Sequence, residues 1–142
     1  FEKVRCLDKQ IEEIVKILGT TVIYDEIENN AYYMTRFNLI VVNVKLSEFE
    51  QKKALLHELG HACEHQENYH LYKTAYALRS KMEYEADCFM VEKLLDEYLN
   101  STGIAPERIN YMKFIEDAKI DARYEDWVKT LLFNKLQRIN FA

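Results

Sequence analysis

Two histidines and a glutamate stand at a spacing that suits metal chemistry. Residues 57–61 read His-Glu-Leu-Gly-His, an H-E-x-x-H pattern. At about 100° per residue, His57 and His61 lie about 40° apart on one face of a helix, one turn from each other. Two imidazoles placed in this way can bind one Zn²⁺. Glu58 would lie beside the ion, where it can take a proton from a water molecule as a general base.

Two histidines leave a zinc site incomplete, so the chain has to supply a third ligand. One class of zinc peptidases extends the motif with Gly and His, but this chain has Glu64 and Glu67 at those positions. His65 lies about 12 Å from His57 along the helix axis, which is too far for both to bind one ion. The third ligand is therefore expected from another segment.

Two glutamates in the string Met-Glu-Tyr-Glu-Ala-Asp at 82–87 compete for this role. Glu83 and Glu85 lie about 200° apart on a helix, so only one of them can face the ion. Glu83 flanks Met82 and Ala86 on the face expected to pack inward. We therefore predict Glu83 as the third ligand. We also predict that Asp87, one turn later, accepts the second N–H of a ligating histidine and fixes its tautomer.

Other polar residues near the motif have weaker assignments. A peptidase also needs a group that stabilises the oxyanion, and five residues are candidates that the sequence does not separate: Tyr69, His70, Tyr72, Tyr76 and Arg79. Cys63 and Cys88 are expected to be small buried hydrophobes, because the chain lacks the paired spacing of a cysteine zinc site. Gly60 costs about 1 kcal/mol inside a helix, which suggests a close approach by the sheet or by substrate backbone.

The N-terminal half is predicted to position the motif with a helix, three strands and a second helix. Apolar residues at helical spacing run from Val4 to Leu18, and Gly19 follows as a C-cap. Three β-rich segments then suggest a small meander with a tight connection at residues 37–38: Thr21–Tyr24, Ala31–Arg36 and Leu39–Val44. Ser47 and Glu50 form a capping box that opens the motif helix, which should end near His65.

The C-terminal half is predicted to be helical. A long helix from about Leu71 to Leu99 carries the third ligand, and seven residues on it share a predicted inward face: Ala75, Leu78, Met82, Ala86, Phe89, Met90 and Leu94. Pro106 should open another helix, and an amphipathic helix follows at about 127–136. The prediction is an α+β fold in one domain, residues 1–142, with a core at about 1–100 and additional helices at about 106–138.

Composition narrows the setting of this chemistry. The chain has 142 residues, with 19 Lys and Arg against 24 Asp and Glu, a net charge of −5. An acidic chain makes nucleic acid an unlikely partner, and the lack of a long apolar run argues against a membrane. Three cysteines without framework spacing suggest reduced thiols and a cytoplasmic location.

On these residues the chain resembles the ImmA/IrrE metallopeptidases, a gluzincin-like family. The resemblance covers about residues 1–100 and rests on residues 57–61 and on Glu83-Tyr84-Glu85-Ala86-Asp87 followed by Phe89. It implies a minimal zincin-like fold in which His57, His61 and Glu83 bind one zinc ion and Glu58 is catalytic. It also implies cleavage of a helix-turn-helix repressor, or a similar regulator, of a phage, mobile element or stress response.

Two functions therefore compete. The first is a zinc-dependent endopeptidase whose substrate is a regulatory protein. The alternative is a non-catalytic binding module, an anti-repressor or toxin-like partner with the same fold. The two differ in whether Glu58→Gln abolishes the effect on the partner.

Overall fold

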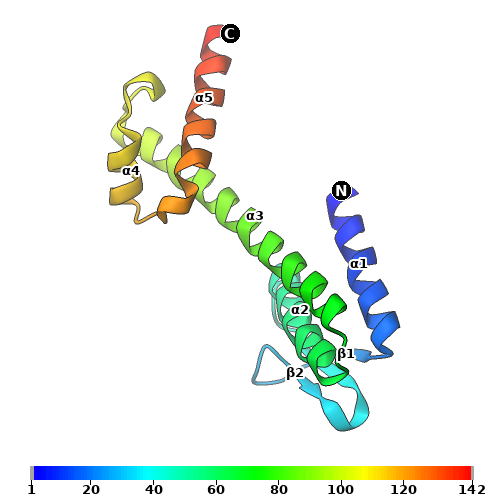
Figure 1. The fold of residues 1–142 in the computed structure, drawn as a ribbon. Helices are drawn as coiled ribbons and strands as arrows, with labels where there is room; N and C mark the ends of the chain where they lie inside the picture. The colour runs from blue at the N-terminus through cyan, green and yellow to red at the C-terminus, as the bar shows by residue number, and fades with distance from the viewer. Residues whose placement is uncertain (1, 142) are drawn as a thin grey trace. The chain divides into compact units, whose positions relative to one another are not determined.

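A computed structural model describes the backbone of residues 2–141 and the side chains of residues 7–138. The order is helix α1 (Glu2–Leu18), strands β1 (Thr21–Asp25), β2 (Ala31–Met34) and β3 (Leu39–Asn43), then helices α2 (Glu48–His65), α3 (Tyr69–Thr102), α4 (Tyr111–Asp117) and α5 (Glu125–Phe141), with short 3₁₀ turns η1 (Thr35–Phe37), η2 (Pro106–Arg108) and η3 (Ala122–Tyr124) (Figure 1). The predicted α+β class is confirmed.

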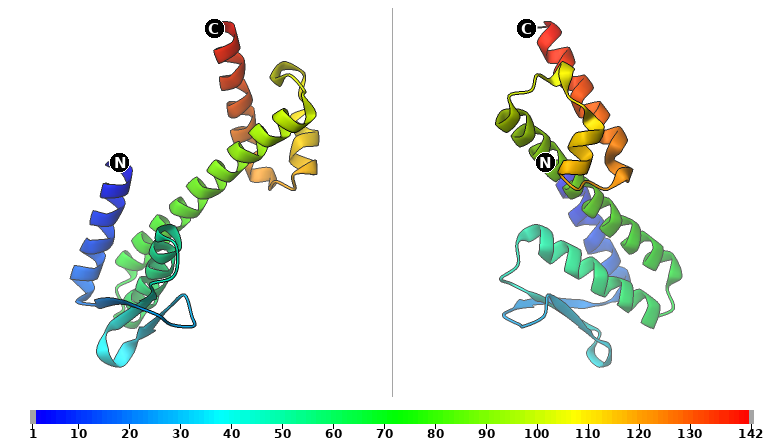
Figure 2. Two further views of the ribbon diagram at one scale, coloured as in Figure 1. Left: turned by 180° about the vertical axis from the view of Figure 1, so that it is seen from behind. Right: turned by 90° about the vertical axis from the view of Figure 1, so that its left-hand side faces the viewer.

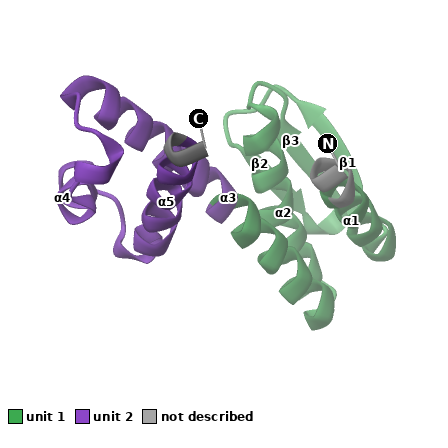
Figure 3. Ribbon diagram, turned by 90° about the horizontal axis from the view of Figure 1, so that it is seen from above, with its two compact units in different colours: residues 1–83 green, residues 84–142 purple. Residues whose placement is uncertain are grey.

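Two compact units divide the chain, at residues 1–83 and 84–142, and the boundary lies inside α3 (Figure 3). Each unit has its own buried apolar cluster. The core of the first unit draws on α1, β3, α2 and the first half of α3. The core of the second draws on the rest of α3, on α4, on η3 and on α5. The single domain stays a prediction.

The sheet is not the meander that the sequence suggested. Its strand order is β1-β3-β2, with β1 parallel to β3 and β2 antiparallel to β3. The central strand β3 is the most apolar, and Ile40, Val41 and Val42 on it are all buried. A strand with neighbours on both sides is shielded more than an edge strand, which explains this run. Helix α2 packs against β2, β3 and α1 (Figure 2).

An asparagine at the tight connection ties several elements together. Asn38 has φ +47°, a left-handed conformation that asparagine tolerates better than most residues. Its amide donates to the carbonyl of Leu18 at the end of α1, and its Oδ1 accepts bonds from Thr20 and from Gln66 at the end of α2. These bonds fix the end of the motif helix against α1 and the sheet.

The start of the motif helix and the long helix after it follow the sequence closely. The Ser47 hydroxyl accepts a bond from the backbone N–H of Glu50 at 3.2 Å, as a cap for α2. The long helix extends to Thr102 and ends at Gly103, where φ is +68°. Pro106 begins a 3₁₀ turn instead of the predicted helix, and the Asn110 side chain caps α4.

The predicted inward face of α3 is correct for its first half and only in part for its second, where Leu94 packs against the second core but Phe89 and Met90 do not. Ala75, Leu78 and Met82 are buried in the first core. Phe89 and Met90 are 58% and 53% exposed, and Val91 and Leu95 are buried in their place. Met82 and Val91 are nine residues apart, which corresponds to about two and a half helical turns. The positions that α3 buries therefore change after Met82, and one continuous stripe does not describe the helix.

Candidate metal centre

The H-E-x-x-H residues gather on the side of α2 that faces away from the core. The other side of this helix carries fully packed apolar residues, of which Leu56 and Leu59 are no more than 1% exposed. His57 and His61 are exposed, and Glu58 is half-buried. The amphipathic pattern of α2 therefore leaves the two imidazoles accessible while their backbone is fixed by the core.

The ligand atoms of His57, Glu58 and His61 lie within 4.8 Å of one another. The two Nε2 atoms are 3.2 Å apart, and the two rings are perpendicular. Zinc bound by two nitrogens at about 2.0–2.1 Å in tetrahedral geometry would place them about 3.3–3.4 Å apart. The spacing and the nitrogen donors therefore fit zinc.

Glu83 lies near this group without being a member of it. Its side chain is exposed on α3, and together with His57 and Glu58 it lines a hollow of about 190 Å³. It is not among the residues whose ligand atoms lie within 4.8 Å of one another. The structure thus brings the two histidines and Glu58 together, and the role of Glu83 as third ligand stays a prediction.

Asp87 contacts a different set of partners. Its Oδ2 accepts a bond of 2.6 Å from the Tyr124 hydroxyl and lies 3.5 Å from a guanidinium nitrogen of Arg123. Burial and the bond to the Asp87 carboxylate raise the pKa of Tyr124 to about 12. The support of a ligating histidine by Asp87 stays a prediction, since these contacts lie within the second unit.

Arg79, one of the five oxyanion candidates, contacts the metal group directly. One of its guanidinium nitrogens contacts Nδ1 of His57. It also lies over the Tyr76 ring, 5.6 Å from the centroid. Arg79 precedes Glu83 by one helical turn, and this i, i+4 spacing was the signal that could have identified it.

A second, smaller hollow of about 70 Å³ borders the same histidines. Its lining includes Gly60, Tyr72, Tyr76 and Arg79, so three of the five oxyanion candidates lie beside the metal group. Tyr69 and His70 line neither hollow. A Cβ built on Gly60 would lie 3.7 Å from the Tyr72 ring, an ordinary contact. The neighbour of this glycine is thus Tyr72 and not the sheet, and an approach by substrate backbone stays a prediction.

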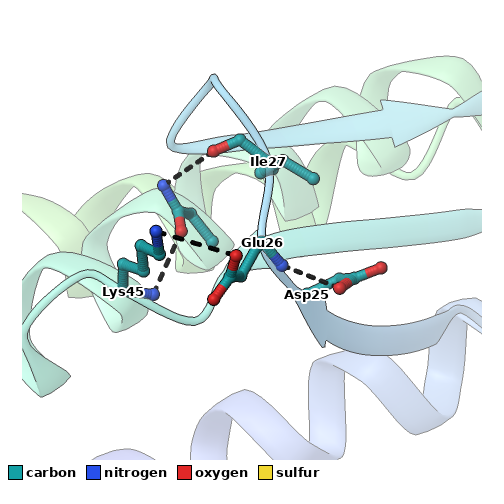
Figure 4. A network of polar contacts seen from close by, with 5 residues as sticks. Asp25, Glu26, Ile27 and Lys45 are labelled. Carbon is teal, nitrogen blue, oxygen red and sulfur yellow. Dashed lines mark hydrogen bonds and ion pairs between the residues drawn. The ribbon is translucent and has the colours of Figure 1, made fainter.

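The rim of the larger hollow is fixed by the loop between β1 and β2. This loop ends at Asn30 and Ala31, which line the hollow. The amide of Asn43 donates to the carbonyl of Ile27 at 3.1 Å, and Lys45 lies 3.6 Å from Glu26 (Figure 4). These contacts hold the loop against the end of β3.

The described cysteines are separate from the metal group. Cys63 is fully buried on the core side of α2, and burial raises the pKa of its thiol. A raised pKa disfavours the thiolate that binds metals, so the prediction of a small buried hydrophobe is confirmed for Cys63. Cys88 is half-buried, and its carbonyl accepts a bond from the Trp127 indole.

Comparison with known proteins agrees with this geometry. No helix among the described residues combines the length and apolar character needed to cross a membrane. No curated protein and no solved structure matches the chain. The family model of the IrrE N-terminal-like domain, a peptidase family, matches residues 15–126, which is more than half of the chain and includes the motif and Glu83. The chain therefore belongs to the IrrE N-terminal-like family of peptidases.

Proposed function

We propose that the chain is a zinc-dependent endopeptidase. The observation that carries the proposal is the group of His57, Glu58 and His61, whose ligand atoms lie within 4.8 Å at a spacing that suits zinc. Family membership supports the same activity. His57, His61 and Glu83 would hold one ion. When bound, zinc acts as a Lewis acid toward the scissile carbonyl and lowers the pKa of a water molecule.

The residues of the chain supply the remaining steps. The Glu58 carboxylate takes a proton from the attacking water and delivers it to the leaving amine. Tyr72, Tyr76 and Arg79 are the candidates that border the histidines and could donate a hydrogen bond to the developing oxyanion. Exposure of the histidines leaves room for a protein substrate to reach the group.

The edge of β2 offers a place for the substrate backbone. β2 has β3 on one side and no strand on the other among the described residues. Ala31, the first residue of β2, lines the hollow beside His57 and Glu58. An extended peptide added to this edge would run past the metal group. Hydrogen exchange would then slow at amides of β2 when a peptide binds, and unchanged exchange would argue against this mode.

A helix-turn-helix repressor, or a similar regulator, is the proposed substrate. This part rests on the family resemblance and not on a feature of the hollow. The test is incubation of the zinc-loaded protein with the regulator encoded beside its gene. Wild type is expected to cleave it, and Glu58→Gln should slow cleavage about 10²–10⁴-fold while keeping the metal.

The matched control is Glu85→Gln, which removes an exposed carboxylate from α3. It should cleave as the wild type does. Retention of both binding and cellular effect by Glu58→Gln would contradict the peptidase and favour the non-catalytic binding module.

A further inference from the structure

Arg79 has hydrogen-bonding capacity that the described part of the chain leaves unused. Its Nε–H is buried and has no hydrogen-bond partner. No carboxylate of the described residues lies within 4.0 Å of its guanidinium, although Glu83 follows one turn later. A buried donor without a partner costs about 1–3 kcal/mol. A guanidinium in this position is therefore ready to bind an acceptor from outside the chain.

The contact that Arg79 does make is not compatible with a metal on the other ring nitrogen. The guanidinium donates to Nδ1 of His57, and Nε2 faces His61. When Nε2 of a neutral imidazole binds a metal, the proton is on Nδ1, which is then a donor. Two donors do not bond each other. Loading the site therefore releases the guanidinium from His57.

The charges around the larger hollow point to the chemistry of the missing partner. Lys53 is already paired with Glu50, at 3.4 Å. Under the proposed function, Glu83 binds the divalent cation and Glu58 is the general base beside it. Arg79 is the remaining charged residue of this lining, and its charge has no counterpart.

The position of Arg79 places such a partner next to the scissile bond. Arg79 and His57 are the two residues that line both hollows. The guanidinium also lies over the Tyr76 ring, which borders the smaller hollow. An anion bound there would lie one residue or so from the carbonyl at the metal group.

We infer that Arg79 selects peptide substrates that carry a carboxylate next to the scissile bond. The carboxylate is that of an Asp or Glu side chain, and the guanidinium fork matches its two oxygens. This inference rests on the proposed function, since it takes the substrate to be a peptide bound at the metal group. In this recognition Arg79 acts as a specificity residue.

The test uses two octapeptide mixtures, randomised except for one central position that is Asp in one and Asn in the other. Binding is measured by fluorescence anisotropy with zinc-loaded Glu58→Gln protein, and cleavage by mass spectrometry with Glu58 intact. The Asp mixture should bind about 10- to 100-fold more tightly than the Asn mixture. The added substitution Arg79→Gln should remove this difference, and Arg79→Lys should keep part of it.

Lys81→Gln is the matched control, because it removes an exposed positive charge from the same helix. It should preserve the preference for Asp. The inference would be overturned if the Glu58→Gln protein with Arg79 intact bound both mixtures equally. It would also be overturned if Arg79→Gln weakened the binding of both mixtures by the same factor. Arg79-dependent binding of the Asp mixture without cleavage by wild type would support carboxylate recognition by Arg79 and contradict the peptidase. Cleavage of both mixtures at equal rates would support the peptidase and contradict the role of Arg79 in selecting substrates.

Discussion

The two halves of α3 perform different tasks. Up to Glu83 the helix buries Ala75, Leu78 and Met82 and presents Arg79 and Glu83 at the hollow beside the motif. Beyond Glu83 it buries the face that carries Val91 and Leu95 against a second core. Helix α3 thus contributes to both cores, and the buried positions change where the proposed ligand segment lies.

The largest expected effect tests the functional half of this comparison. Glu83→Ala should weaken zinc binding by more than about 100-fold, because a lost ligand costs more than a lost supporting residue. Glu85→Ala, two residues later on the other side of the helix, should leave zinc affinity unchanged. Competition with a fluorescent chelator measures both affinities. Equal affinities in the two variants would assign the third ligand elsewhere.

The structural half of the comparison predicts opposite outcomes for two apolar residues. Leu95 is fully buried, so Leu95→Ala should lower the free energy of unfolding by about 2–5 kcal/mol. Phe89 is 58% exposed, so Phe89→Ala should change it by less than about 0.5 kcal/mol. Urea denaturation of the two variants gives both values. If Phe89→Ala lowered the free energy of unfolding more than Leu95→Ala, the buried face of α3 would be the one that the sequence predicted.

The helices and strands of the fold differ in how far the sequence alone predicts them. Local signals predicted the helices and strands well, because Ser47, Gly19 and Gly103 act on their own turns. The pairing of β1 with β3 depends on contacts between distant segments, and so does the face that α3 buries after Met82. The sequence of a short apolar strand does not show which strand it pairs with. Helical periodicity does not show where a helix leaves one core and begins to pack in another.

The site divides in the same way. The histidines and Glu58 were predictable, because a spacing of four within one helix is local and its geometry is fixed. Arg79 and Tyr72 reach the group from another helix, so their contacts depend on how α2 and α3 pack. Among the five polar candidates, the i, i+4 spacing from Glu83 favoured Arg79, but it did not show that Arg79 reaches His57.

A hydrogen bond to Asp87, in the second half of α3, should make stability depend on pH in the alkaline range. Tyr124 donates to Asp87, and burial together with this bond raises its pKa to about 12 from an ordinary value of 10. A raised pKa means that the neutral phenol is favoured in the folded state. The contribution of the Tyr124 phenol to the free energy of unfolding is complete below pH 10 and is lost as the pH rises through 12.

Tyr124→Phe should remove this decline between pH 10 and 12 and should lower stability at neutral pH by about 1–3 kcal/mol. Thermal denaturation at several pH values measures both effects. Tyr24→Phe, at an exposed tyrosine, is the control and should leave neutral stability unchanged. A variant that declines with pH as steeply as the wild type would rule out Tyr124 as the cause.

The smallest expected effect concerns the motif helix, which packs against the first half of α3 through Tyr72. Gly60→Ala should raise stability by about 0.4–1 kcal/mol, because the added methyl meets the Tyr72 ring at an ordinary distance. Gly19→Ala should instead destabilise, since φ there is +63°. Thermal unfolding compares the two. A loss of stability in Gly60→Ala would show that this contact is tighter than the structure indicates.

The measurement that tests the central claim most directly is X-ray absorption at the zinc edge on protein purified without added metal, with the metal content determined on the same sample. We expect one zinc ion per chain, bound by two imidazole nitrogens and a carboxylate oxygen at about 2.0–2.2 Å. His61→Ala should lose the metal. Zinc-free native protein, or a sulfur ligand at about 2.3 Å, would contradict a site built from His57, His61 and Glu83.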